Sequence, residues 1–293
     1  MKKTGKINVF SVIIFIVLTV FSLSLIVLLG WGLISSVKDP LADFLGNPVG
    51  FPKTWKFSNY KYVLENFVVP VTNSAGFTEK IGMPQQILNT ILICTTSAFL
   101  STFFPCLTGY VVAKYEYKFG KVLYAVALVV MMLPIIGAEA STLELLQKLH
   151  IHDTFFSIIF QRSAYTGLYF FVFEATFRAI SNDFYEAASL DGASDAGIFF
   201  KIMFPMVIYT FLTVFMLIFI ANWNDYQYPL MYLPSMPTLA YGLYSVSEST
   251  LQSLNNVPMR MAGSCILVFP IMVVFIIFKD RLMGNVSMGG LKE

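Results

Sequence analysis

The stretch INVFSVIIFIVLTVFSLSLIVLLGWGLISSV, residues 7–37, contains no Asp, Glu, Lys or Arg. About 20 helical residues cross the roughly 30 Å hydrocarbon core of a bilayer, so this stretch is long enough to span one. It is too long for the apolar core of a secretory signal peptide, and no A-x-A cleavage site precedes Lys38. We therefore interpret it as a retained first membrane helix.

The composition of the whole chain also indicates a membrane protein. Of its 293 residues, 57% are apolar and only 12% are charged, about half the charged fraction of a typical soluble protein. A soluble domain of this size cannot cover so much apolar surface. The composition therefore excludes a soluble enzyme, a disordered chain and a collagen, and the net charge of +2 is too small to indicate a nucleic-acid partner.

Five further apolar stretches are long enough to cross the membrane, and none alternates with the period of two expected for barrel strands. Residues 226–247 also lack charge, but three prolines within nine residues argue against a spanning helix, so we expect an external loop there. The third span is expected to continue through Pro134 as a kinked helix. The prediction is an all-α polytopic fold with six transmembrane helices, at about residues 10–36, 86–113, 121–147, 154–179, 202–223 and 259–280.

Lysine and arginine are concentrated at the N-terminus and in the short connections on its side of the membrane, which predicts that both termini are cytoplasmic. The expected organisation has three parts. Residues 1–85 hold the first helix and a long extracytoplasmic loop. Residues 86–281 form a five-helix core with a second extracytoplasmic loop at 224–258, and residues 282–293 form a cytoplasmic tail.

The connection between the fourth and fifth spans has an unusual sequence, SNDFYEAASLDGASD at residues 181–195. Ser181 or Asn182 can cap a helix, Asp191-Gly192 indicates a turn, and Ser194 can cap a second helix. We expect a helix–turn–helix at about 181–200, called the elbow below. Small alanines at 187 and 188 would allow another surface to approach closely. Acidic residues replace the usual positive charge of a cytoplasmic loop, which favours docking into a groove on another protein: Asp183, Glu186, Asp191 and Asp195.

The elbow also carries a recognisable motif. Glu186-Ala187-Ala188, followed at fixed spacing by Gly192, Ile202 and Pro205, resembles the EAA signature of ABC importer permeases. One position departs from it, because Phe204 stands where Leu is usual. From about residue 86 onward the chain is similar to the carbohydrate branch of these permeases, in particular to their shorter, six-span subunits. The supporting motifs are Asn89-Thr90, Met131-Met132-Leu133-Pro134, Trp223-Asn224-Asp225 and the small-residue tail at 287–292.

This resemblance implies a type I ABC importer permease-like fold whose elbow inserts into a cleft of an ATPase subunit. It implies that the chain lies in the cytoplasmic (inner) membrane of a bacterium or archaeon. It also implies four kinds of partner: a second, homologous permease subunit, a dimer of ABC ATPase subunits, an extracytoplasmic solute-binding protein, and a sugar substrate. The residues that it assigns to ATPase coupling are Asp183, Glu186, Ala187, Ala188, Asp191, Gly192, Ile202 and Pro205.

The chain lacks the sequence signature of an ATPase. No G-x-x-x-x-G-K-[ST] occurs, since Gly120-Lys121 is followed by Val122, so we expect this chain to bind no cofactor and to be a transport subunit and not an enzyme. ATP and Mg²⁺ would bind to the partner ATPase. The segment 150–153 contains only two histidines, and we expect no metal site there.

Six polar or aromatic residues in or near the predicted spans are candidates for a translocation path. A charge at mid-bilayer costs about 2.5–3.5 kcal/mol on insertion scales, so charged members should face the helix bundle or a wet cavity. Three other interpretations stay open. Arg162 and Glu139 can form an interhelical ion pair, Asn89 can make an interhelical hydrogen bond, and residues 223–225 can be an interfacial aromatic belt with a helix cap. The candidates are Asn89, Glu139, Arg162, Trp223, Asn224 and Asp225.

Two alternatives belong to other classes of protein. An intramembrane enzyme would need ionisable groups from several spans that converge on one point. A secondary transporter of a small polar solute would usually show an internal repeat with interrupted helices in both halves, and we find no such repeat.

Overall fold

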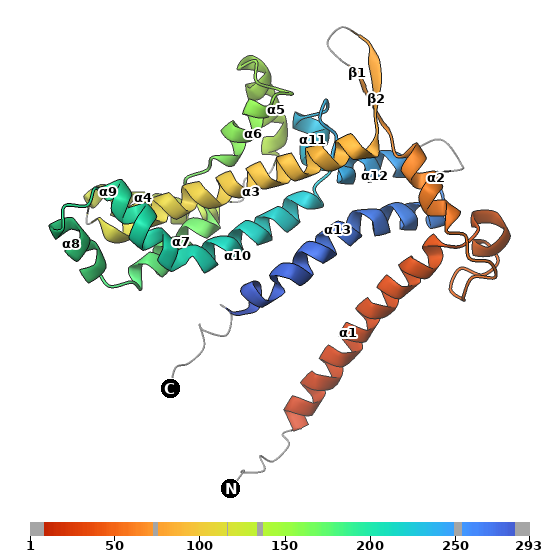
Figure 1. Ribbon diagram of the computed structural model, residues 1–293, viewed down its shortest axis with the longest axis horizontal. Coiled ribbons are helices and arrows are strands. Elements are labelled where there is room, and N and C mark those ends of the chain that lie inside the picture. Colours follow the sequence, from red (N-terminus) through yellow and green to blue (C-terminus); the bar gives the residue numbers. More distant parts are fainter. Residues whose placement is uncertain (1–8, 73–75, 116, 134–136, 249–253, 285–293) are drawn as a thin grey trace. The chain divides into compact units, whose positions relative to one another are not determined.

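A computed structural model describes residues 9–72, 76–115, 117–133, 137–248 and 254–284 (Figure 1). These residues are mostly helical, and a two-stranded hairpin is the only sheet among them. They divide into two compact units. The first runs up to Val68 and includes Leu243–Phe269, and the second comprises Val69–Gly242 with the chain from Pro270 onward.

Four helices in the described residues are long and apolar enough to cross a membrane. They correspond to the first, second, fifth and sixth predicted spans, and the fifth is preceded by a π-helical turn, η2 (Phe199–Met203). The four are α1 (Val9–Ser36), α3 (Met83–Lys114), α10 (Phe204–Trp223) and α13 (Val257–Gly284).

The prediction that the third and fourth spans are continuous helices is wrong. The third is divided into α4 (Lys118–Met132) and α5 (Ala138–Lys148). Leu133 is extended because a residue before proline is disfavoured in the helical region, and Gly137 has a φ of +80°. Pro134 itself lies outside the described residues.

The predicted fourth span is likewise divided into α6 (Phe155–Arg162) and α7 (Leu168–Arg178). Gly167, just before α7, has a φ of +134°, a backbone conformation that L side chains rarely adopt. The count of six spanning helices therefore stays a prediction, and four are found.

The two predicted external loops contain short elements of their own. Residues 226–247 hold α11 (Gln227–Tyr232) and α12 (Leu239–Ser247), and neither is long enough to span a bilayer. The first loop contains a π-helical turn, η1 (Pro40–Phe44), the helix α2 (Ser58–Asn66), and an antiparallel hairpin. In that hairpin β1 (Val69–Thr72) pairs with β2 (Thr78–Ile81), Val69 opposite Ile81, which is a small departure from an all-α chain.

The second unit is built on α3, which packs along α7 and α10 (Figure 1). Gly109 allows α3 and α7 to approach closely, because a Cβ atom there would lie 2.8 Å from the backbone nitrogen of Glu174. Aromatic side chains fill the core beside it, with ring centroids 4.9–5.3 Å apart for Tyr110 on Phe199 and on Phe177. Edge and tilted contacts of this kind add to the energy of apolar burial.

The close approach at Gly109 can be tested with alanine. We expect Gly109→Ala to lower the thermal unfolding midpoint of the purified chain in detergent, since overpacking costs about 1–3 kcal/mol. Gly120→Ala in α4 is the matched control, because its new methyl group would meet Val112 at an ordinary 3.8 Å. Equal midpoints for the two variants would contradict the packing described here.

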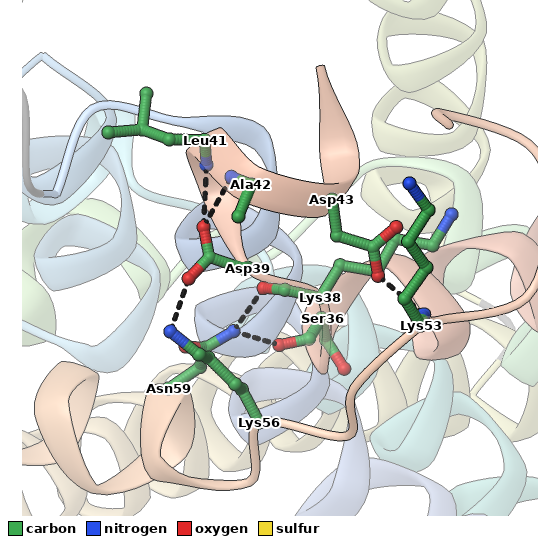
Figure 2. A network of polar contacts seen from close by, with 9 residues as sticks. All are labelled: Ser36, Lys38, Asp39, Leu41, Ala42, Asp43, Lys53, Lys56 and Asn59. Carbon is green, nitrogen blue, oxygen red and sulfur yellow. Dashed lines mark hydrogen bonds and ion pairs between the residues drawn. The ribbon is translucent and has the colours of Figure 1, made fainter. Parts of the chain in front are cut away.

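A polar network in the first unit organises the chain that follows α1 (Figure 2). The Asp39 carboxylate accepts hydrogen bonds from the backbone N–H groups of Leu41 and Ala42, at 2.9 and 2.7 Å, and pairs with the ammonium of Lys56. Asn59 of α2 donates to the carbonyl oxygens of Ser36 and Lys38, each at 2.8 Å. The network therefore caps η1 and ties the end of α1 to α2.

The contacts at Asp39 predict a pH dependence. The hydrogen bond from Lys56 and those from the backbone lower the pKa of Asp39 from 3.8 to about 2. Because the folded-state pKa is the lower one, the carboxylate stabilises the fold at pH values above 3.8, and this contribution is lost as the pH falls towards 2.

Asp39→Asn should therefore lower the unfolding midpoint in detergent at pH 7, and the difference from the unmodified chain should shrink as the pH falls below 3.8. Glu65→Gln is the control, because Glu65 forms only an exposed pair with Lys61 at 3.9 Å. A difference that persists at pH 2 would contradict this account of Asp39.

Candidate functional site

The elbow consists of α8 (Asp183–Leu190), a tight turn, and α9 (Asp195–Ile198). Asp183 and Glu186 lie in the first turn of α8, where the helix dipole favours negative charge. Gly192 has a φ of +79° and ends α8 in the left-handed conformation that glycine adopts most readily. The hydroxyl of Ser194 accepts a hydrogen bond from the N–H of Gly197 at 3.2 Å and caps α9.

The two faces of α8 differ in character. Leu190 is 89% exposed and Phe184 is 50% exposed, and Ala187 also lies on the surface. Ala188, in contrast, is buried in the core of the second unit with Ile198. The expectation that both alanines form an approach surface is therefore corrected: Ala187 is exposed, whereas Ala188 anchors α8 to the protein.

The end of α3 bonds to the elbow at two places, just before α8 and at the start of α9. The ammonium of Lys114 donates to the carbonyl oxygen of Ile180 at 2.5 Å and to Asn182 Oδ1 at 3.0 Å. One residue later, the hydroxyl of Tyr115 donates to Asp195 Oδ1 at 2.9 Å. Figure 1 shows the elbow beside this end of α3.

Tyr185 of α8 takes part in the same contacts, and we call the contacts of Lys114, Tyr115 and Tyr185 with the elbow the anchor. The Tyr185 hydroxyl donates to the same oxygen of Asp195 at 3.2 Å, and its ring meets that of Tyr115 edge-on, with centroids 5.6 Å apart. Burial and the hydrogen bonds with Tyr185 and Asp195 raise the pKa of Tyr115 above the ordinary tyrosine range, so its hydroxyl keeps its proton and remains a donor.

Sequence reasoning did not find the anchor. Lys114 is 66 residues from Ile180, and Tyr115 is 80 residues from Asp195. Nothing in the local pattern links positions so far apart. The one available signal was a lysine and a tyrosine together at the end of a predicted span, which also fits an interfacial belt.

Ile202 and Pro205 join the elbow to the fifth span. Ile202 is half-buried and packs against the core of the second unit. Pro205 directly follows the π-helical turn η2 within the continuous helix Asp195–Trp223, and it has no N–H to donate to the preceding turn. Phe204, the departure from the motif, fits its ring against Phe211 with centroids 5.1 Å apart.

A second cluster lies where α6 meets α11. The guanidinium of Arg162 lies 3.9 Å from a carboxylate oxygen of Asp225 and 4.2 Å from the ring centroid of Tyr228. Asp225 also accepts a hydrogen bond from the N–H of Tyr228 at 3.0 Å, which caps α11. One carboxylate and one aromatic face thus stabilise a cation that is only 27% exposed.

These residues border a cavity of about 10 Å³, which is room for about one water molecule. Three polar atoms of its lining residues are buried without a hydrogen-bond partner in the described residues: Ser97 Oγ, Arg162 Nε and Asn222 Nδ2. The cluster as it stands has no space for a larger solute.

The other path candidates do not join this cluster. The alternative interpretation that Arg162 pairs with Glu139 does not hold: Arg162 pairs with Asp225, and Glu139 is exposed at the start of α5. Its backbone carbonyl accepts a hydrogen bond from the hydroxyl of Tyr232 at 3.2 Å. The pair was considered for continuous third and fourth spans, and in the structure both spans are divided.

The remaining three candidates contact other parts of the second unit. Asn89 is buried in α3 and donates to the carbonyl oxygen of Pro237 at 3.1 Å. Trp223 is buried with its ring 5.7 Å from that of Phe219, and Asn224 is exposed and donates to the Ile220 carbonyl at 3.0 Å. Among the six path candidates, Arg162 and Asp225 form an ion pair in the part of the chain that the structure describes.

Four long apolar helices in the described residues, with a folded elbow just before α10, indicate an integral membrane protein. Residues 106–287 match the family described as binding-protein-dependent transport system inner membrane component, and the chain belongs to this family. The carbohydrate-branch resemblance noted from the motifs points the same way.

Known relatives and a solved structure agree with this membership. The chain is 26% identical to the arabinooligosaccharides transport system permease protein AraQ of Bacillus subtilis, over 82% of this chain and 80% of that protein. It is 26% identical to the diacetylchitobiose uptake system permease protein NgcG of Streptomyces coelicolor, over 96% and 88%. A bacterial ABC transporter involved in the import of alginate contains a chain of the same fold, with a TM-score of 0.73 and 20% identity over 93% and 96%.

The Arg162–Asp225 pair allows a test of what burial adds to an ion pair. In a double-mutant cycle with Arg162→Met and Asp225→Asn, we expect a coupling free energy of about 0.5–3 kcal/mol, measured from unfolding in detergent. The control cycle uses Lys148→Met and Glu144→Gln, a pair 2.7 Å apart whose side chains are 72% and 65% exposed.

The control pair is shorter but solvated, so it should contribute only about 0.3–0.5 kcal/mol. A larger coupling for the exposed pair than for Arg162–Asp225 would contradict the view that partial burial strengthens the Arg162–Asp225 pair.

Proposed function

We propose that this chain is one of two permease subunits of an ATP-driven importer that carries a sugar or oligosaccharide into the cytoplasm. An extracytoplasmic binding protein delivers the solute, and a separate pair of ABC ATPase subunits supplies the energy. The single observation that carries this proposal is the elbow, because it combines an exposed acidic and apolar surface with firm attachment to a membrane helix.

The ATPase assignment is supported by chemistry as well as by family. The sequence has no phosphate-binding loop with a lysine and a hydroxyl residue, so the energy of ATP has to reach it from another polypeptide. ATP and Mg²⁺ bind to that partner, and this chain binds no cofactor.

The elbow offers the partner ATPase a suitable surface. Its exposed Leu190 and Phe184 can enter an apolar groove, and Glu186 and Asp191 can face basic residues at the rim of that groove. Ala187 lets the partner approach the helix backbone. Gly192 adopts the positive φ that the turn between the two helices requires.

The anchor gives the proposed mechanism a physical route. A force on α8 passes through the Lys114 and Tyr115 contacts to the end of α3, and Gly109 holds α3 against α7. Closure of the ATPase dimer would thus move these helices together, as a two-state element that alternates between inward-open and outward-open forms.

The proposed orientation places both termini and the elbow in the cytoplasm and residues 224–258 outside, in the inner membrane of a bacterium or archaeon. The positive charges beside the predicted spans support it. A sugar as solute is supported by the relatives, whose names identify arabinooligosaccharides and diacetylchitobiose as their cargo.

The proposed solute path runs near the cluster where α6 meets α11. Arg162 and Asp225 remain its best candidates because they converge, but their cavity of about 10 Å³ admits one water molecule and no sugar. A sugar could reach them only after α6 and α11 separate, so we assign the cluster to a closed form of the path. A lining role for Asn89, Glu139, Trp223 and Asn224 stays a prediction.

The elbow also supplies the decisive test. Glu186→Lys and Gly192→Pro should each leave the chain inserted in the membrane while uptake of labelled sugar falls and no longer follows ATP hydrolysis. Charge reversal would repel the rim of the partner groove, and proline cannot adopt the positive φ of Gly192.

Glu144→Lys is the matched control, because it makes the same charge change on an exposed residue of α5, away from the elbow. Uptake should be normal in this control. Normal uptake in both elbow variants as well would remove the elbow from the mechanism, and the proposed function with it.

A further inference from the structure

The chain between α1 and α2 exposes an unusual number of large apolar side chains. Six of them are each more than half exposed, although soluble surfaces normally show such residues singly. Trp55 and Phe57 stack on one another, with ring centroids 6.2 Å apart. The six are Leu41, Leu45, Val49, Phe51, Trp55 and Phe57, and we call residues 37–57 the apolar loop.

Several charged side chains of the apolar loop bond to groups within the loop. Lys38 is fully buried and donates from its ammonium to the carbonyl oxygen of Asn47 at 2.7 Å. Asp43 is buried and accepts from the N–H of Lys53 at 2.8 Å, while Asp39 caps η1 and pairs with Lys56. Lys38, Asp39 and Asp43 therefore bond to the backbone of this segment, and Asp39 also pairs with Lys56, whereas Lys53 is exposed (Figure 2).

Several groups of this irregular backbone are paired within the loop. The Asn47 side chain alone accepts from the N–H of Gly50 and donates to the carbonyl of Phe51, both at 2.9 Å. Irregular backbone in water needs no such provision, because solvent supplies the missing hydrogen bonds. At the edge of a hydrocarbon phase, an unsatisfied group costs several kcal/mol, so internal pairing becomes necessary.

Contacts with α1 fix the depth of the apolar loop. The indole N–H of Trp31, in the last turns of α1, donates to the Pro48 carbonyl at 2.9 Å, and its ring lies 6.5 Å from that of Phe44. Trp31 is 22 residues beyond Val9, the start of α1, or about 33 Å along a helix. This separation matches the thickness of the hydrocarbon core, so Trp31 lies where interfacial tryptophans gather.

We propose that the apolar loop binds the membrane and lies in the boundary between lipid headgroups and acyl chains, on the side of the bilayer opposite to the N-terminus. Its occupant is lipid because the exposed apolar side chains continue the surface of α1, whose large apolar residues from Val9 to Leu29 are exposed along the helix. The loop lies flat at the interface, as a monotopic element does. This inference does not depend on the proposed transport function.

Spin labelling at exposed positions tests the proposal without disturbing the fold. Cys94, Cys106 and Cys265 are first replaced by alanine, and a nitroxide is attached to a single cysteine at Leu45 or at Phe51. Control labels replace Leu28 in the exposed apolar part of α1 and Glu65 in α2. The full chain, with any subunits that co-purify, is placed in nanodiscs of phosphatidylcholine and phosphatidylglycerol.

Accessibility to oxygen and to a neutral nickel chelate then separates the possible surroundings. We expect the labels at 45 and 51 to lose nickel accessibility relative to Glu65 and to keep high oxygen accessibility, as at Leu28. Nickel accessibility equal to that at Glu65 would show water around the loop and overturn the proposal. Exclusion of both reagents would show a covering protein and overturn it as well.

A second pair of variants tests whether the polar network holds the loop at this depth. Asn59→Ala removes two hydrogen bonds, to Ser36 and Lys38, and should raise the nickel accessibility of a label at Phe51. Asn66→Ala removes a single exposed bond to Tyr62 and should leave it unchanged. Unchanged accessibility in Asn59→Ala would overturn the role given to the network.

Discussion

A chain that enters hydrocarbon must satisfy its own backbone hydrogen bonds, because no water is present to do so. This constraint explains why the long apolar stretches are helices, and it also governs the segments between them. In α1 and α10 it is met by uninterrupted helical bonding. In the apolar loop it is met by Lys38, Asp39, Asp43 and Asn47, whose side chains bond to backbone groups. These polar side chains face the backbone of the loop and thus leave its outer surface apolar.

The same constraint shows which parts of the fold the sequence could predict. Unbroken apolar runs such as 7–37 allow one structure, a continuous helix, and α1, α3, α10 and α13 follow from length and hydropathy alone. The stretches around Pro134 and Gly167 allow two, since a helix can be kinked or can be divided. Both divide here, at a left-handed Gly137 and at Gly167 with a φ of +134°. The choice depends on tertiary packing, which a single-sequence pattern does not contain.

The candidate site shows the same division between local and distant information. The turn at Gly192 and the cap at Ser194 are local, and both were readable from residue types. The anchor was not, because Lys114 and Tyr115 meet their partners across 66 and 80 residues. An ion pair of Arg162 was considered as one interpretation, but with Glu139 as the acid. Arg162 pairs instead with Asp225, because the end of α6 meets the chain just before α11, whereas Glu139 is exposed at the start of α5.

The anchor also combines two kinds of interaction with different mechanical properties. Aromatic contacts among Tyr110, Phe177 and Phe199 fill the core below the elbow, and such contacts tolerate small shifts in any direction. The bonds from Lys114 and Tyr115 are directional, and they connect α3 to the residues just before α8 and to the first residue of α9. When a force acts on the exposed face of α8, these bonds therefore already hold α8 and α9 in place relative to α3. The elbow cannot bend between its two helices without breaking one of these bonds, so displacement passes on to α3, where Gly109 leaves no gap against α7 to absorb it.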